Sequence, residues 1–151
     1  MIKKNLVSVL MSTHNSEKTI RKAIESIINQ TYKDLEFLIV DDCSDDNTYK
    51  IIKDYSIKYN FIKIFQNESN IGLTKSLNKL IKNSNGKFIA RQDADDESLK
   101  ERLDLQISNL IKNDVDFCVS RAIDIQSKNK IPRFSNYLPT KYVLKYKNPF
   151  I

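Results

Sequence analysis

Three aspartates lie within four residues of one another in the segment Asp93-Ala94-Asp95-Asp96, directly after a strand-like run at 87–92. Carboxylates this close repel one another and lose hydration at the end of a strand, unless a cation or hydrogen-bond donors compensate. Hard divalent ions bind such oxygen clusters, and Mg²⁺ commonly combines one or two carboxylates with the phosphates of a ligand. The cluster therefore suggests a metal ion that holds a phosphorylated ligand. Aspartates that cap the next helix in a solvated turn are the alternative.

Two further polar clusters follow apolar runs. They are Ser12-Thr13-His14-Asn15, after residues 6–11, and Asp41-Asp42, after residues 35–40. A carboxylate in the second cluster can accept hydrogen bonds from a ligand N–H group or from sugar hydroxyls, whereas the residues after it, 45–47, have the types of helix caps. His14 is the only histidine, and the two cysteines lie far apart in sequence, so the chain lacks the ligand set of a zinc site.

These clusters must be positioned by the elements between them. Apolar runs predict five strands, at 6–11, 35–40, 61–65, 87–92 and 115–120. Helical spacing predicts four helices: one capped by Asn15 or Ser16, one capped within 45–47, one between Gly72 and a left-handed cap at Gly86, and one at 99–112. Strand and helix alternate, which is typical of an α/β fold with a mostly parallel sheet and helices on both faces.

Parallel strands place their carboxyl ends along one rim of the sheet, and ligands of such sheets bind beyond that rim. We therefore expect the three polar clusters to converge on one site. The chain has only two glycines and no glycine-rich phosphate loop. The charge of a phosphate would then have to be met by a metal ion rather than by a backbone cradle.

The net charge of +6 is placed unevenly. Residues 121–151 contain seven basic residues and one acidic residue, so they carry the whole excess, and residues 1–120 are neutral. A neutral body argues against a nucleic-acid partner. No apolar stretch has the length of about 18 residues that a transmembrane helix needs. The two cysteines and the absence of an export signal favour a cytoplasmic protein.

Five blocks carry a family resemblance, in consistent order. They are VSVLMSTHN (7–15), SIINQTY (26–32), EFLIVDDCSDDNT (36–48), NIGL with SLN (70–78) and GKFIARQDADD (86–96), with Arg102-Leu103 after them. Together they resemble the inverting family 2 glycosyltransferases, and the Ala-Arg-x-Asp-Ala-Asp-Asp form resembles bacterial enzymes that build surface polysaccharides. The resemblance implies an enzyme with a GT-A fold, which is a Rossmann-like, mostly parallel sheet with helices on both faces.

The resemblance also implies a donor, a metal and an acceptor. The donor is a nucleoside-diphospho-sugar, UDP-linked, the metal is Mg²⁺ or Mn²⁺, and the acceptor is a glycan or a lipid-linked sugar attacked with inversion. The implied donor-binding residues are Ser12, Thr13, His14, Asn15, Asp41, Asp42, Asp93 and Ala94. Asp42 is implied to contact the base. Asp95 and Asp96 are implied to meet the metal, with Asp93 in the same DxD region.

Departures from the family pattern also matter. Ser12 stands where the family often has proline, and His14 where it often has tyrosine, so the nucleotide preference stays open. Family members usually continue well past residue 151. We therefore expect a nucleotide-sugar-binding core at 1–120 and a basic, aromatic start of the acceptor-side region at 121–151. The fold is then C-terminally incomplete, and the general base, an Asp or Glu, is expected beyond residue 151.

The residues after the first strand argue against two other classes of α/β protein. A response-regulator receiver and a haloacid-dehalogenase-type phosphatase both need acidic residues after the first strand, where this chain has Ser-Thr-His-Asn. A non-catalytic nucleotide-sugar-binding module that uses the same rim without a base remains open. The basic and aromatic residues of 121–151 also suit peripheral contact with an anionic membrane at the inner face. A core segment that lacks its cover would show the same pattern.

Overall fold

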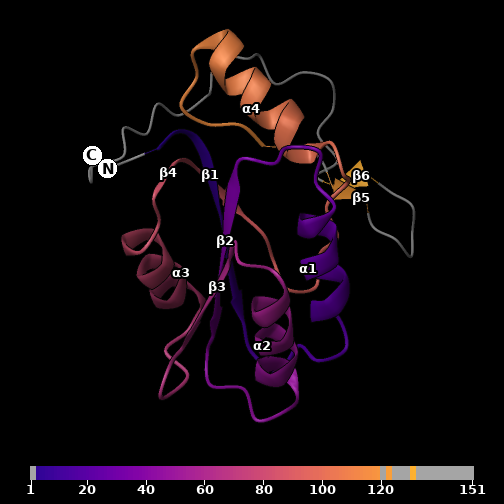
Figure 1. Cartoon of the computed structure of the whole chain (residues 1–151), viewed down its shortest axis with the longest axis vertical. Helices are drawn as coiled ribbons and strands as arrows, with labels where there is room; N and C mark the ends of the chain where they lie inside the picture. The colour runs from indigo at the N-terminus through magenta and orange to yellow at the C-terminus, as the bar shows by residue number, and fades with distance from the viewer. Residues whose placement is uncertain (1–2, 120–121, 124–129, 132–151) are drawn as a thin grey trace. The chain divides into compact units, whose positions relative to one another are not determined.

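The structure, a computed structural model, describes residues 3–119, 122–123 and 130–131 (Figure 1). The chain divides into two compact units, residues 1–101 and 102–151. The first unit contains β1 (Lys3–Thr13), α1 (Ile20–Ile28), β2 (Leu35–Asp41), α2 (Thr48–Lys58), β3 (Ile62–Gln66), α3 (Leu73–Lys82) and β4 (Gly86–Arg91). The second unit contains α4 (Arg102–Asn113), β5 (Ala122–Ile123) and β6 (Lys130–Ile131).

The sheet of the first unit has four strands in the order β3-β2-β1-β4, and every pair is parallel. The register places Thr13 beside Asp41 and Leu10 beside Arg91. The chain moves outward from β1 through β2 to β3 and then crosses back to add β4 on the other side of β1. Strand order therefore reverses between β1 and β4, and the crevice beyond the carboxyl ends of strands at such a reversal is where ligands of open α/β sheets bind.

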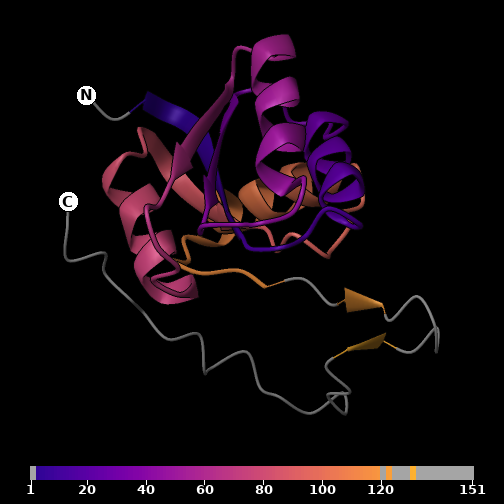
Figure 2. The same cartoon turned by 90° about the horizontal axis from the view of Figure 1, so that it is seen from below.

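Helices cover both faces of this sheet, as the alternation of elements predicts. Figures 1 and 2 show α3 on one face and α1 with α2 on the other. Leu10, Leu38 and Val40 form a buried cluster with Leu80 of α3. Because strand side chains alternate between faces, their neighbours Val9, Met11, Phe37 and Ile39, all fully buried, point to the other face. On α1, residues Ile20, Ala23, Ile24 and Ile27 are buried.

Gly86 has a different role from the one predicted. The expected left-handed cap is wrong, because α3 ends with Asn83 as its C-cap at a φ of −102° and Gly72 is the only glycine with positive φ. Gly86 begins β4 instead. A Cβ at this position would lie 2.7 Å from Leu6 O and from Ser8 N, so glycine is required there by the close approach of β1.

Helix starts also differ from the prediction. The N-cap of α1 is Thr19, not Asn15 or Ser16. The reason is tertiary: the N–H groups of Ser16 and Glu17 donate to Thr48 and Asp46, which lie at the start of α2. The cap of α2 falls within 45–47 as predicted, with Asn47 at the N-cap position and the Asp46 carboxylate accepting from the Thr48 N–H at 2.8 Å.

In the second unit, α4 begins at Arg102 rather than at Leu99. The carbonyl groups of Leu99 and Lys100 accept hydrogen bonds from Gln30 and Thr31 and so are committed to a loop. The predicted strand at 115–120 is wrong for its described part, because residues 115–119 have no regular structure and their Phe117 and Val119 are 57% and 71% exposed. Within the described ranges, no helix is both long and apolar enough to cross a membrane.

Candidate functional site

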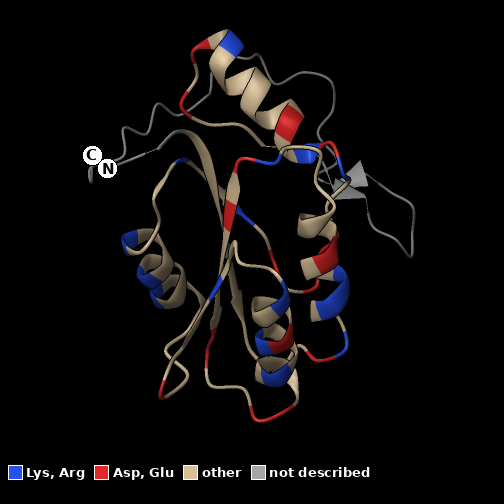
Figure 3. Ribbon diagram, viewed as in Figure 1, with Lys and Arg blue, Asp and Glu red and all other residues tan. Residues whose placement is uncertain are grey.

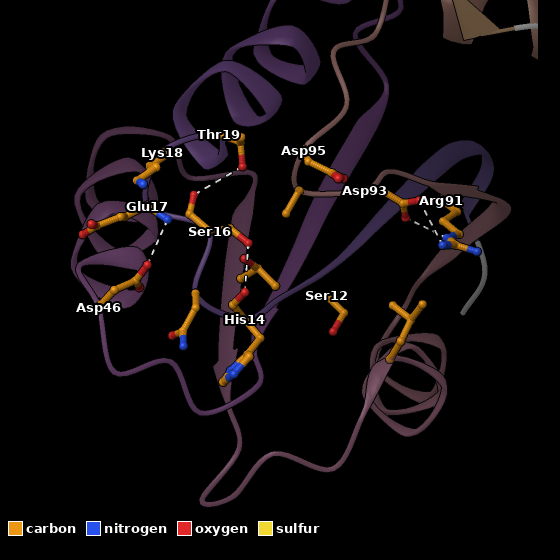
Figure 4. Close-up of a pocket in the computed structure, with 14 residues that line it drawn as sticks. Ser12, His14, Ser16, Glu17, Lys18, Thr19, Asp46, Arg91, Asp93 and Asp95 are labelled. Atoms are coloured by element: carbon orange, nitrogen blue, oxygen red, sulfur yellow. Dashed lines mark hydrogen bonds and ion pairs between the residues drawn. The ribbon is translucent and has the colours of Figure 1, made fainter. Parts of the chain in front are cut away.

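A pocket of about 610 Å³ opens at the reversal between β1 and β4 (Figure 4). Its walls come from the segment that ends β1 and leads to α1, from the end of β4 and the loop after it, and from two single residues. The lining residues are Ser12 to Thr19, Arg91, Asp93, Ala94, Asp95, Asp46 and Leu73. The pocket thus joins two segments that are neighbours only because β1 pairs with β4.

The pocket collects most of the residues that the sequence analysis singled out. Ser12, Thr13, His14 and Asn15 line one part of it, and Asp93, Ala94 and Asp95 line another. Asp41, Asp42 and Asp96 do not line it. Figure 4 shows Ser12 between His14 and the Arg91–Asp93 pair, so the polar end of β1 faces the acidic loop.

The segment after β1 is held by the loop after β2. The Asn15 N–H donates to Ser44 Oγ at 3.0 Å, and the Asp45 N–H donates to Asn15 Oδ1 at 3.0 Å. The Glu17 N–H donates to Asp46 Oδ2 at 3.1 Å. Burial by itself raises the pKa of Asp46, but hydrogen bonds from Thr48 and from the Glu17 N–H outweigh it and lower that pKa. The loop after β2 therefore holds this wall of the pocket in place through three hydrogen bonds.

Asp42 follows β2, does not line the pocket and is only 3% exposed. Its Oδ1 accepts from Asn67 Nδ2 at 2.7 Å and from the Ile71 N–H at 3.0 Å, and its Oδ2 accepts from the Gly72 N–H at 2.8 Å. Burial raises the pKa of Asp42, yet these hydrogen bonds lower it overall. The carboxylate thereby holds Gly72 at a φ of 85°, a left-handed conformation that suits glycine, at the start of α3.

His14 contacts the backbone of Asp42. Its Nδ1 lies 3.0 Å from the carbonyl oxygen of Asp42, so Nδ1 carries the proton and donates it. The ring is exposed and lines the pocket. His14 therefore links the pocket wall to the backbone of Asp42 without using the Asp42 carboxylate.

Two buried oxygen atoms near the pocket have no hydrogen-bond partner: Thr13 Oγ1 and Asp41 Oδ1. The two residues are register partners at the ends of β1 and β2 and are 3% and 0% exposed. Asp41 Oδ2 accepts only long hydrogen bonds, from the Ser44 N–H at 3.2 Å and from Gln66 at 3.3 Å. Unsatisfied buried oxygens are rare in native proteins and mark a place where water or a ligand group completes the bonding.

The acidic loop is shaped by Gln92, a residue that the sequence analysis did not single out. Its side chain is 3% exposed, and its Nε2 donates to the carbonyls of Asp93 at 3.1 Å and Asp96 at 2.8 Å. Ser98 Oγ donates to Gln92 Oε1 at 2.6 Å. One buried amide therefore fixes the turn that presents Asp93 and Asp95. Its only sequence signal was a polar residue between an apolar strand and the acidic cluster.

Arg91 is a second residue that the sequence analysis left out of the site. Its Nε donates to Asp93 Oδ1 at 2.8 Å and its Nη2 donates to Asp93 Oδ2 at 2.9 Å. Figure 4 shows this pair at the edge of the pocket. Both oxygens of Asp93 are thus engaged by one guanidinium group.

The donor set of the loop bears on metal binding. Asp95 is exposed and lines the pocket, whereas Asp93 is paired with Arg91. Within the described part of the chain, no three histidine, cysteine or acidic side chains are grouped closely enough to hold a metal ion. These residues do not fit a metal cage made by protein alone. They fit a Mg²⁺ or Mn²⁺ ion that Asp95 shares with the phosphates of a ligand, the arrangement that Mg²⁺ favours.

Charged side chains of both signs surround the pocket. Figure 3 shows acidic residues in the loop after β2, whereas α3 carries lysines and no acidic residue. In the pocket itself, four acidic residues and two basic residues lie among the lining residues: Glu17, Asp46, Asp93 and Asp95, with Lys18 and Arg91. Of the two basic residues, Arg91 is paired with Asp93.

The four-stranded parallel sheet with helices on both faces is an α/β fold of the GT-A type. The sequence profile described as "Glycosyl transferase family 2" matches residues 8–150, and the chain belongs to that family. The fold class and the family inferred from the resemblance are therefore confirmed. The family is one of enzymes, and it includes proteins of bacterial polysaccharide synthesis.

One relative is UDP-Glc:alpha-D-GlcNAc-diphosphoundecaprenol beta-1,3-glucosyltransferase WfgD of Escherichia coli. It is 35% identical over 129 residues, which are 85% of this chain and 50% of WfgD. The chain spans between 39% and 50% of the lengths of three such relatives.

Two solved structures share the fold. TarS 1–349 of S. aureus, in complex with UDP-GlcNAc, is 34% identical with a TM-score of 0.68, and the match covers 73% of this chain and 32% of that one. The mannosyltransferase PcManGT from Pyrobaculum calidifontis, in complex with GDP-Man and Mn²⁺, is 21% identical with a TM-score of 0.65. That match covers 82% of this chain and 36% of PcManGT, and at this identity it bears on the fold alone.

Proposed function

We propose that this chain supplies the donor-binding part of a glycosyltransferase. The donor is a nucleoside-diphospho-sugar, UDP-linked, and the acceptor is a glycan or a lipid-linked sugar of bacterial surface-polysaccharide synthesis, at the inner face of the membrane. The observation that carries the proposal is that Ser12–Asn15 and Asp93–Asp95 line the same pocket at the strand reversal. The complex of TarS with UDP-GlcNAc and the name of WfgD support a UDP-linked donor and a lipid-linked acceptor.

The pocket residues divide the donor between them. Ser12, Thr13, His14 and Asn15 frame the nucleoside, whose base lies toward His14 and the backbone of Asp42. The carboxylate of Asp93 and the backbone carbonyl of Ala94 accept hydrogen bonds from hydroxyl groups of the donor. Asp41 and Asp42 act from beneath this wall, where Asp41 Oδ1 and Thr13 Oγ1 still need partners. Asp95, exposed at the mouth of the pocket, holds the divalent ion, with Asp96 next to it in the same turn.

The chemistry follows from that placement. The acceptor hydroxyl oxygen attacks the anomeric carbon from the face opposite the diphosphate, the bond from that carbon to the diphosphate oxygen breaks, and the configuration inverts. The proton of the hydroxyl passes to a general base, a role that we assign to no residue of the described pocket. A bound divalent ion would stabilise the negative charge of the departing diphosphate.

Isothermal titration calorimetry tests the donor site. UDP and GDP are titrated into the 151-residue chain with and without Mn²⁺, and into Asp95→Ala. Because Asp95 supplies an oxygen ligand to the ion, this variant should bind nucleotide about tenfold or more weakly in Mn²⁺. Asp34→Ala, an exposed aspartate just before β2, is the matched control and should bind as the wild type does. Metal-independent binding of equal strength in all three proteins would contradict the proposal.

Transfer assays separate an enzyme from a binding module. Donor binding without sugar transfer or donor hydrolysis, in the chain and in any longer form that contains it, would favour the non-catalytic nucleotide-sugar-binding module. Transfer to a lipid-linked acceptor would support the enzyme.

A further inference from the structure

The ion pair between Arg91 and Asp93 has the geometry of a dedicated clamp. Two parallel hydrogen bonds, of 2.8 Å and 2.9 Å, join the two side chains across the end of β4. Both residues line the pocket. A bidentate pair of this kind fixes the plane of the carboxylate as well as its position.

Stability of the fold does not explain this pair. The side chains of Arg91 and Asp93 are 56% and 38% exposed. Exposed ion pairs contribute between about 0 and 1 kcal/mol, because water and salt screen them. The pair lies instead on the wall of the pocket, next to the one carboxylate, Asp95, that is exposed there.

We propose that Arg91 is a positioning residue that reserves Asp93 for hydroxyl groups of the donor and keeps it out of the metal's ligand set. The inference rests on the proposed donor site. A carboxylate has about four lone-pair positions, and the guanidinium takes one on each oxygen. The remaining positions can accept from a neutral hydroxyl. A divalent cation at the same oxygens would have to approach a fixed positive charge.

The consequence is that the protein alone offers the metal too few ligands. With Asp93 held by Arg91, Asp95 is the exposed carboxylate of the acidic loop that lines the pocket and can meet the ion. No three-residue metal cluster occurs among the described residues. The ion then binds well only together with the diphosphate. Removing Arg91 should release Asp93, which lies two residues from Asp95, to serve as a second carboxylate ligand.

Electron paramagnetic resonance of Mn²⁺ with no nucleotide present tests this directly. Arg91→Ala should raise the affinity of the 151-residue chain for Mn²⁺ on the order of tenfold, because a second carboxylate is added. The double variant Arg91→Ala/Asp93→Asn should return to the wild-type affinity. Asp93→Asn alone should not raise Mn²⁺ affinity, since Asp93 is not a ligand in the wild type and its loss leaves the Arg91 charge unpaired. Arg91→Lys, which keeps the charge without the fork, should fall between the wild type and Arg91→Ala.

Two controls keep the outcomes distinct. Lys82→Ala removes one positive charge from the exposed end of α3 and should not change Mn²⁺ affinity. An unchanged or lower affinity in Arg91→Ala, or a double variant that binds Mn²⁺ as tightly as Arg91→Ala does, overturns the inference. The metal arm uses no nucleotide, so failure of wild-type chain to bind UDP or GDP would count against the proposed donor site and not against the role of Arg91.

Discussion

At the scale of single residues, Asp42 shows how a buried carboxylate can organise a site without facing it. Its two oxygens accept three hydrogen bonds, from Asn67, Ile71 and Gly72, and its carbonyl accepts from His14. Three of these contacts fix the loop before α3, and the fourth fixes the pocket wall. Asp42 therefore couples the pocket wall at His14 to the start of α3, whose first residue, Leu73, also lines the pocket.

Replacement of Asp42 by asparagine should destabilise the fold and weaken nucleotide binding together. The amide would turn a donor toward N–H groups, and a buried hydrogen bond lost in this way costs about 1–3 kcal/mol. Because the pKa of Asp42 is lowered in the fold, its contribution is present above the ordinary pKa of 3.8 and is lost as the pH falls below it. Urea midpoints and calorimetry with UDP measure the two effects. Asp45→Asn, at an exposed aspartate three residues further along the chain, is the control. Equal urea midpoints for the Asp42 and Asp45 variants would refute the prediction.

The sequence indicated two of the segments that line the pocket, but Asp41, Asp42 and Asp96, also predicted for the site, do not line it. Ser12 to Asn15 and Asp93 to Asp95 were predicted to meet, because both groups follow strands, and they do line one pocket. Gln92 and Arg91 were missed, since their roles depend on a turn that brings the carbonyl groups of Asp93 and Asp96 to one amide and the Asp93 carboxylate to one guanidinium. Such short-range geometry leaves no periodic pattern in a sequence.

At the scale of secondary structure, one buried charge links all the strands at the end of the sheet away from the pocket. Glu36 of β2 accepts from Ser8 of β1 at 2.7 Å, from Lys63 of β3 at 2.8 Å, and from the N–H of Asn85, the residue before β4, at 2.6 Å. Burial raises the pKa of Glu36, but these hydrogen bonds outweigh it and lower the pKa from 4.5 to about 2. The ionised carboxylate of Glu36 thus links β2 by hydrogen bonds to β1, to β3 and to the residue before β4.

Glu36→Gln should therefore lower stability in a pH-dependent way. The lowered pKa means that the ionised Glu36 stabilises the fold fully above pH 4.5 and loses this effect as the pH falls toward about 2. At pH 7 the variant should lose about 1–3 kcal/mol of unfolding free energy relative to the wild type, and the difference should narrow by about pH 3. Urea unfolding at the two pH values measures it, with the exposed Glu68→Gln as control. A difference that is the same at both pH values would show that the charge of Glu36 is not the cause.

Most strands of the first unit were predictable because their buried residues form continuous apolar runs in the sequence. The apolar run at 35–40 predicts a strand, and β2 is buried from Glu36 to Asp41. Boundaries failed where tertiary hydrogen bonds compete with the helix, as at Ser16 and Glu17. Gly86 was misread because a close approach between strands and a left-handed turn both require glycine, and the sequence alone does not separate them.

At the scale of the whole molecule, charge separates the chain into a neutral body and a basic end. Residues 121–151 carry the net charge of +6 together with many of the aromatic residues. Apart from the two short strands, β5 and β6, this stretch lies outside the described residues. Its composition nevertheless supports contact with an anionic surface, where each lysine or arginine contributes about 1 kcal/mol at low salt.

Liposome co-sedimentation checks this prediction. The chain should bind vesicles that contain anionic phosphatidylglycerol and should release them at high salt, because the attraction is electrostatic. Changing Lys141, Lys145 and Lys147 together to glutamine should reduce binding. Changing Lys33, Lys75 and Lys82, which are exposed residues of the first unit, removes the same charge and should have little effect. Binding that is absent, or that both triple variants reduce equally, would exclude a membrane role for the basic end.

The strand reversal between β1 and β4 has a consequence for how the family can diversify. One side of the pocket follows β1 and is hydrogen-bonded to the loop after β2. The other side follows β4 and is hydrogen-bonded by the Gln92 side chain. The hydrogen bonds of the first side run between residues 15 and 44–45, and the side-chain hydrogen bonds of the second run within the acidic loop, so the two sets share no residue. On the proposed assignment of the donor site, base preference and phosphate handling then belong to different segments of the pocket. Exchanging residues 12–17 together with 44–48 between relatives should transplant the choice of nucleobase while leaving the acidic turn in place.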